Sequence, residues 1–115
     1  MCGCDMNTSE LNKYIMDNHI NEDGRFSFVI PRIELNDGES LSVQATENHY
    51  CKPRENEGPW HLVEVGYPSV DPGEVWREYF DGDWENESHT DSVYGYVPID
   101  LVIDFINAHG GMKQP

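Results

Sequence analysis

Four side chains with the chemistry of metal ligands fall into two short motifs. Cys2 and Cys4 form a Cys-x-Cys motif, and His49 and Cys51 are two residues apart, on one face of an extended segment. Thiolates and imidazoles are the ligands of tetrahedral structural zinc sites, so these residues could stabilise a small zinc-bound interaction module. The spacing differs from the paired Cys-x-x-Cys motifs of common zinc sites, and packing of Cys51 as a small hydrophobe is the simpler interpretation. Zinc therefore stays an alternative, and the sequence predicts no cofactor.

Carboxylates alternate along residues 81–87, as the oxygen ligands of a calcium loop do. An EF-hand loop that began at Asp81 would place Asn86 where the turn needs glycine and Ser92 where the ion needs a bidentate glutamate. A solvated acidic face therefore explains these carboxylates better than a calcium site does.

No known catalytic motif occurs in the chain. Gly-x-Ser-x-Gly, His-Glu-x-x-His and a phosphate-cradling glycine loop are all missing. The chain has five histidines, but their spacing selects no acid–base pair, and His61 alternates with Val63 and Val65 as a residue at the edge of a core would. The sequence therefore predicts a protein that is not an enzyme.

The most distinctive stretch covers residues 71–91, which we call the acidic segment. It holds eight carboxylates against a single base, Arg77, and four aromatic side chains lie among them. Solvated acidic tails carry few aromatics, so we expect this segment to fold against a core and to hold its charges at fixed positions. Carboxylates held in this way can imitate the phosphates of a duplex, and aromatics beside them can anchor an interface. The residues expected to bind a partner are Asp71, Glu74, Trp76, Glu78, Asp81, Asp83, Trp84, Glu85, Glu87 and Asp91.

The whole chain is acidic, with 22 Asp and Glu, 7 Lys and Arg, and a formal net charge of −15. Such a charge repels nucleic acid and anionic membranes, so the expected partner is a basic, nucleic-acid-binding protein. Reversing Asp81, Asp83 and Glu85 to lysine should then abolish partner binding and leave the fold intact. The alternative is that the charges only keep the protein soluble, with the aromatics facing its own core.

The length and composition predict one globular domain over residues 1–115, in which residues 1–6 and 112–115 are loose ends. No apolar run is long enough to span a membrane, and the N-terminus lacks the basic region and apolar core of a secretory signal. Three cysteines is an odd number, which favours a reduced, cytoplasmic protein over a disulfide-linked one.

Local signals predict two helices. Asn7 followed by Glu10 has the form of a capping box, and Leu11 and Ile15 begin a buried stripe that ends in the polar turn of residues 17–24. Pro98 suits the first position of a second helix, residues 99–106 repeat apolar side chains at helical spacing, and Gly110 suits the end of that helix. One further helical turn is expected at residues 74–80.

Strands are expected at residues 25–35, 41–46, 60–67 and 92–97, because β-forming residues alternate there with polar ones. Phe26, Phe28 and Ile30 would share one face of the first strand, and Tyr94 and Tyr96 one face of the last. The short connections favour an antiparallel meander. The predicted fold is α+β, an antiparallel sheet of about four strands with one or two helices packed on one face.

In size, acidity and lack of a catalytic motif, the chain resembles the small phage-encoded anti-defence proteins, both anti-CRISPR and anti-restriction, several of which imitate nucleic acid. The stretches at residues 50–54, 63–68 and 93–98 are similar in character to phage proteins. The resemblance implies an inhibitor that occupies the DNA- or RNA-binding site of a Cas effector or restriction enzyme in the host cytoplasm. It carries over no functional residue. An inhibitor that binds through a sheet edge or an apolar patch, with its acidity incidental, is the second alternative.

Overall fold

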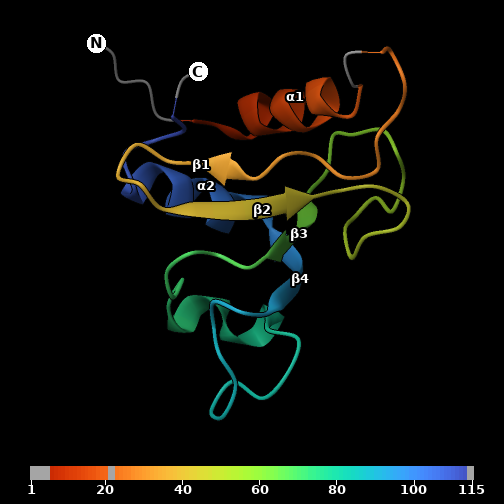
Figure 1. The fold of residues 1–115 in the computed structure, drawn as a ribbon. Helices are drawn as coiled ribbons and strands as arrows, with labels where there is room; N and C mark the ends of the chain where they lie inside the picture. The colour runs from red at the N-terminus through yellow and green to blue at the C-terminus, as the bar shows by residue number, and fades with distance from the viewer. Residues whose placement is uncertain (1–5, 21–22, 114–115) are drawn as a thin grey trace.

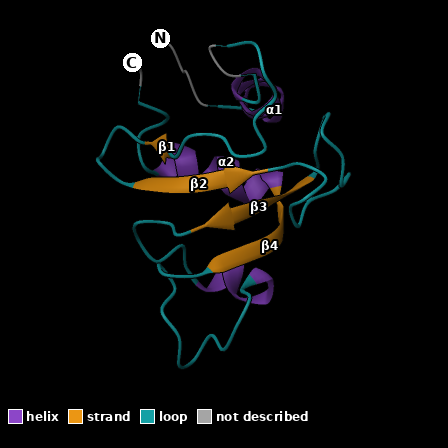
Figure 2. Cartoon of the chain, turned by 45° about the vertical axis from the view of Figure 1, so that its right-hand side comes forward, coloured by secondary structure: helices purple, strands orange, loops and turns teal. Residues whose placement is uncertain are grey.

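The computed structural model describes residues 6–20 and 23–113 of the chain. They form an α+β fold, in which a four-stranded antiparallel sheet has the strand order β1-β2-β3-β4 (Figures 1 and 2). The elements are α1 (Thr8–Asn18), β1 (Ile33–Glu34), β2 (Ser40–Gln44), β3 (Leu62–Gly66), the 3₁₀ helix η1 (Glu74–Tyr79), β4 (Val93–Pro98) and α2 (Ile99–Ala108). The predicted fold class is confirmed.

The capping box that begins α1 is confirmed. The Asn7 side chain accepts a hydrogen bond from the backbone N–H of Glu10 at 2.9 Å, and the Glu10 carboxylate accepts one from the backbone N–H of Asn7 at 3.1 Å. Leu11 and Ile15 are fully buried and turn this helix toward the core. The box therefore fixes where α1 starts, and the apolar stripe fixes its orientation.

The predicted strand at residues 25–35 is largely wrong, because only Ile33–Glu34 joins the sheet. Phe26 and Phe28 are exposed. The backbone of Ile30 bonds to a side chain instead of a strand: its N–H donates to Gln44 Oε1 at 2.9 Å, and its carbonyl accepts from Gln44 Nε2 at 3.1 Å. Pro31, which has no N–H to donate, separates this side-chain pairing from the strand that begins at Ile33.

The predicted placement of Tyr94 and Tyr96 on one face of β4 is also wrong, because the pairing of β4 with β3 contains a register shift. Val63 pairs with Val97 and Val65 pairs with Tyr94, so residues 95 and 96 stand opposite residue 64 alone. Tyr94 is buried while Tyr96 is exposed. The extra residue turns Tyr96 away from the face that strict alternation would give it.

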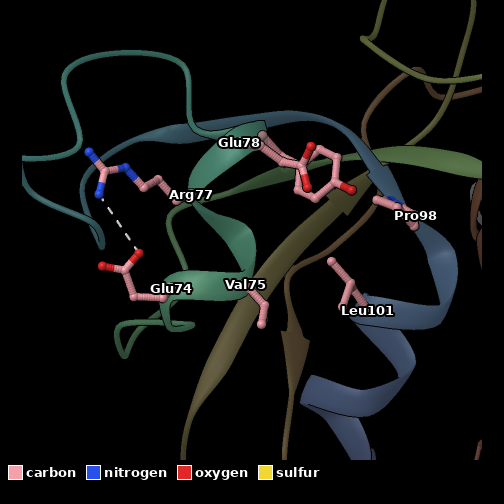
Figure 3. A pocket seen from close by; sticks show the side chains of 7 residues that line it. Glu74, Val75, Arg77, Glu78, Pro98 and Leu101 are labelled. Atoms are coloured by element: carbon pink, nitrogen blue, oxygen red, sulfur yellow. Dashed lines mark ion pairs between the residues drawn. The ribbon is translucent and has the colours of Figure 1, made fainter.

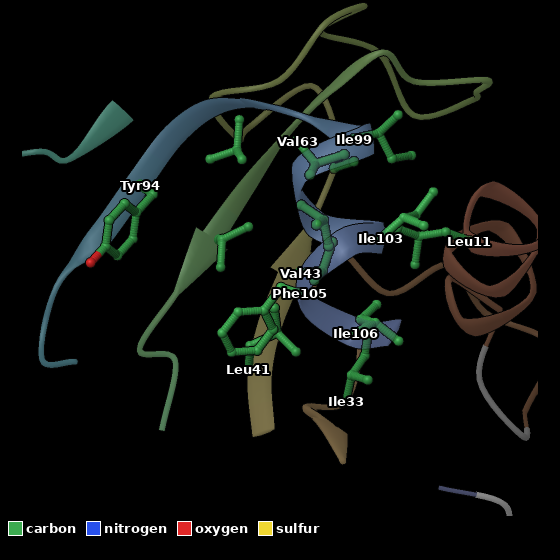
Figure 4. Close-up of a cluster of buried hydrophobic side chains, with 14 of the residues drawn as sticks. Leu11, Ile33, Leu41, Val43, Val63, Tyr94, Ile99, Ile103, Phe105 and Ile106 are labelled. Atoms are coloured by element: carbon green, nitrogen blue, oxygen red, sulfur yellow. The ribbon is translucent and has the colours of Figure 1, made fainter. Parts of the chain in front are cut away.

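The core lies between the sheet and α2, and α1 packs against α2 (Figures 2 and 4). Leu41 and Val43 of β2 and Val63 of β3 are fully buried on the face that α2 covers. Pro98 stands at the N-cap of α2 rather than at its first helical position, and Gly110 follows the C-cap with a φ of 88°. No helix in the described part of the chain is long and apolar enough to cross a membrane.

Both outer strands of the sheet are hydrogen-bonded on their outer sides. The N–H of Lys113 donates to the carbonyl of Glu34 in β1 at 2.8 Å, and the N–H of Asp81 donates to the carbonyl of Val93 in β4 at 3.0 Å. Residues 112 and 113 are therefore not loose, and the backbone of Met6 is likewise held by two hydrogen bonds to the side chain of Asn107. The other residues predicted as loose ends, 1–5 and 114–115, lie outside the described residues.

Candidate partner-binding surface

The acidic segment forms η1 and the loop that returns to β4, at the end of the molecule opposite α1 (Figure 1). Its eight carboxylates are all exposed, and they belong to Asp71, Glu74, Glu78, Asp81, Asp83, Glu85, Glu87 and Asp91. The structure thus gathers these predicted partner-binding residues on one projecting part of the protein.

The aromatic residues of this segment attach it to the core. Trp76 is only 2% exposed, and its ring centroid lies 5.5 Å from that of Tyr94 in β4 and 5.9 Å from that of Phe105 in α2. Phe80 is also buried against Tyr94. The predicted role of Trp76 as an anchor for a partner is therefore wrong, because its indole has almost no surface to offer. Trp84 is half-buried on Phe80 and keeps a partly exposed ring.

Several carboxylates of the loop hold its backbone in place. Asp83 accepts hydrogen bonds from the side chain of Asn86 at 2.7 Å and from the N–H of Glu85 at 3.1 Å, and these bonds lower the pKa of Asp83. The carboxylate of Glu87 accepts from the N–H of Asp83 at 2.9 Å. The loop is therefore internally bonded, although it contains no helix or strand.

His89 closes the loop onto the residues that precede η1. Its Nδ1 lies 2.7 Å from Asp71 Oδ2, its Nε2 lies 2.8 Å from the carbonyl oxygen of Trp84, and its ring stacks on the Trp84 indole at 3.5 Å. Both partners are acceptors, so the protonated, cationic imidazole satisfies both of them, because each of its ring nitrogens then donates a hydrogen bond. The hydrogen bonds to Trp84 and Asp71 accordingly raise the pKa of His89. Sequence reasoning missed this contact because His89 and Asp71 are 18 residues apart.

The charge of His89 makes the stability of the closed loop depend on pH. The folded protein holds this proton more tightly than the unfolded chain, whose histidine pKa is about 6.5. The stabilisation is therefore complete below about pH 6.5 and is lost as the pH rises through the raised pKa of His89. We expect the difference in unfolding free energy between wild type and His89→Gln to shrink from pH 6 toward pH 9, as measured by urea denaturation. His61→Gln, which changes an exposed histidine, is the control, and a His89→Gln difference that stays constant with pH would contradict the charged contact.

The only arginine of the acidic segment is already engaged within it. Arg77 Nη2 lies 2.5 Å from Glu85 Oε1, and Arg77 Nη1 lies 3.9 Å from Glu74 Oε2. Among the described residues, no Lys, Arg or His forms an ion pair with Glu78, Asp81 or Asp91. These three carboxylates therefore carry charge that the protein itself does not balance by direct contact.

A wide hollow lies between η1 and the start of α2, with a volume of about 660 Å³. Val75 and Leu101 provide apolar walls, and the Glu74–Arg77 ion pair lies at the rim (Figure 3). Glu78 also lines the hollow. The acidic surface therefore includes an apolar recess that a partner side chain could fill.

Two of the four candidate zinc ligands, His49 and Cys51, lie in the described residues, and both contact Thr46. Cys2 and Cys4 lie outside the described residues. Cys51 is buried with its thiol 3.2 Å from the carbonyl oxygen of Thr46, and burial raises the pKa of this thiol. His49 Nδ1 lies 2.8 Å from the hydroxyl of Thr46. No group of three or more His, Cys, Asp or Glu side chains in the described ranges is arranged to hold a metal ion.

The acidic segment thus combines exposed charge, a fixed backbone and partly exposed aromatic and apolar side chains at one end of the fold. Exposed charge can complement the opposite charge of another macromolecule, and exposed apolar side chains can add contact area. No protein family model, curated protein or solved structure matches the chain, so no relative assigns a function or a site to it.

Proposed function

We propose that the protein binds a basic, nucleic-acid-binding protein and occupies the site where DNA or RNA would enter. The observation that carries this proposal is that eight exposed carboxylates lie on a backbone held by the core and by its own hydrogen bonds. A protein that neutralises phosphates with Lys and Arg offers such a surface a ready-made complementary site. The target class is a host defence enzyme, such as a Cas effector or a restriction enzyme, in the cytoplasm of the host cell.

The fixed backbone matters because a duplex presents its charges at a regular spacing, about one per 1.7 Å along its axis. A disordered acidic chain would lose conformational entropy when it matched that spacing. Here Trp76 and Phe80 hold one part of the segment on the core, and His89 ties the loop to Asp71. The backbone that carries the carboxylates is therefore held in place before the partner arrives, which lowers the cost of binding.

The test is capture of the partner from a lysate of the natural host on immobilised protein, at low and at high salt, with mass spectrometry of the retained proteins. We expect one nucleic-acid enzyme to be retained at low salt, to be released as the salt rises, and to be displaced by added DNA or RNA. These outcomes follow because phosphate-like contacts are screened by ions and because the two ligands would compete for one site. Failure of DNA and RNA to displace the retained protein would contradict occupation of the nucleic-acid site.

A second candidate function has its own structural support. Ile20, Phe26, Phe28 and Val29 are exposed close to one another in the sequence, beside the end of α1. An interface through these apolar side chains, with the acidity incidental, would give binding that rises or stays level as salt is added. Retention of a partner that ignores salt would favour this surface over the acidic segment.

A further inference from the structure

Another, smaller hollow lies on the acidic surface, between residues 78–81 and β4. Its volume is about 290 Å³, and its polar and aromatic lining comes from three separate parts of the chain. We call it the tyrosine pocket, and it is lined by Tyr50, Glu78, Tyr79, Phe80, Asp81, Gly95 and Tyr96.

The backbone positions Tyr50 firmly against β4. Its N–H donates to Glu64 Oε2 at 2.9 Å, and its carbonyl accepts from the N–H of Tyr96 at 2.9 Å. A Cβ at Gly95 would lie only 3.2 Å from the Cβ of Tyr50, so the glycine leaves room for the tyrosine to lie close to the strand. The two rings of Tyr50 and Tyr96 are consequently near each other, with centroids 5.7 Å apart.

Tyr96 stands in a backbone conformation that does not suit a large side chain. Its φ is 53°, in the left-handed region, which is unfavourable for residues other than glycine. Tyr96 is 38% exposed, so core packing does not explain its presence at this position. The register shift in β4 accounts for this conformation, and it leaves the Tyr96 side chain at the surface beside Tyr50.

The side chains that line the pocket favour a cationic ligand. The faces of tyrosine rings are electron-rich and attract cations, and Glu78 and Asp81 add two carboxylates that no described base pairs with. Tyr50 already accepts a cation in this structure, since the guanidinium carbon of Arg54 lies 5.6 Å from the centroid of its ring. A guanidinium can stack on a ring and donate two parallel hydrogen bonds to a carboxylate, which an ammonium cannot do.

We propose that the tyrosine pocket receives an arginine side chain of the basic partner, stacked on a tyrosine ring and hydrogen-bonded to Glu78 or Asp81. The proposal rests on the proposed function only for the source of this arginine. The preference of the pocket for a guanidinium can be measured on the isolated protein, with no partner present.

The experiment is a titration with the capped peptide acetyl-Gly-Arg-Gly-amide, followed by NMR of the tyrosine ring protons at about 0.15 M salt. The matched probes are the peptides with citrulline, which has the shape of arginine without its charge, and with lysine. We expect saturable shifts of Tyr50 and Tyr96 with the arginine peptide, with a dissociation constant of about 1 mM, weaker binding of the lysine peptide and none of the citrulline peptide. Equal shifts with the arginine and citrulline peptides would overturn the proposal.

Variants distinguish binding of the arginine peptide in the tyrosine pocket from its general electrostatic attraction to an acidic protein. Tyr96→Gly removes a ring and relaxes the backbone, and the double variant Glu78→Gln with Asp81→Asn removes the two charges; each should weaken arginine-peptide binding by about tenfold or more. The control is Tyr67→Gly, because Tyr67 is 50% exposed with a φ of 50° but does not line the pocket. Equal losses in Tyr67→Gly and Tyr96→Gly would overturn the assignment of the site.

The capture experiment distinguishes this proposal from the proposed function. If the arginine peptide binds as expected but no basic partner is retained from the lysate, the pocket stands and the proposed function fails. If a salt-sensitive partner is retained equally by wild type and Tyr96→Gly and the peptide does not bind, the proposed function stands and the pocket fails.

Discussion

Reversal of Glu78, Asp81 and Asp91 to lysine is expected to weaken binding of the captured partner by at least about 100-fold at low salt, with the fold intact. Each change places a positive charge against a basic surface, and like charges brought together at an interface cost several kcal/mol. The three side chains are exposed and form no ion pair with a described base, so their loss breaks none of the ion pairs that support the loop. Isothermal titration calorimetry measures the affinity, and circular dichroism checks the fold.

The matched control reverses three exposed carboxylates outside the acidic segment, Glu55, Glu57 and Asp104, and changes the net charge by the same amount. Affinity that falls equally in both variants would show that total charge, and not the acidic segment, determines binding. The structure makes this set cleaner than the reversal of Asp81, Asp83 and Glu85 that the sequence suggests. Asp83 caps the loop and Glu85 pairs with Arg77, so that reversal would also loosen the backbone.

Replacement of Trp76 by alanine is expected to lower the unfolding free energy by about 3–5 kcal/mol. The buried indole packs on Tyr94 and Phe105, and its removal leaves a cavity where η1, β4 and α2 meet. The total stability of a domain is only about 5–15 kcal/mol, so this loss is a large fraction of the whole. Urea denaturation followed by circular dichroism measures it.

Val75→Ala is the control for Trp76→Ala, because the neighbouring Val75 is 65% exposed on the same helix and should cost less than about 0.5 kcal/mol. If Trp76→Ala does not fold, Trp76→Phe retains part of the packing and gives a measurable, smaller loss. A Trp76→Ala cost no larger than that of Val75→Ala would show that the indole does not attach η1 to the core.

The sequence predicted the parts of the fold that depend on neighbouring residues. Asn7 and Glu10 cap α1 through contacts within one turn, and the alternation of Leu41 and Val43 matches the buried face of β2. Gly110, placed at the end of α2, adopts the positive φ expected there. Signals of this kind are local, so a pattern of side chains is enough to indicate them.

The features that sequence reasoning missed depend on contacts between distant parts of the chain. The side chain of Gln44, and not a neighbouring strand, forms the hydrogen bonds to the backbone of Ile30, and no spacing rule in the sequence indicates such a contact. The register shift at Tyr96 follows from how β4 meets β3, because the extra residue has no signature in β4 alone. For the candidate site, the acidity and exposure of the segment were predictable, whereas the cationic contact of His89 required the fold to bring Asp71 to it.

The hydrogen bonds along the outer sides of β1 and β4 have a consequence for self-association. An open sheet edge can template the addition of further strands, which is a common route to fibrils and domain swapping. Here residues 112–113 run along β1 and residues 80–81 run along β4, so an incoming strand would first have to displace a segment of the protein's own chain. The two edges of the sheet therefore do not offer a free row of backbone groups to which a strand of a second copy could add.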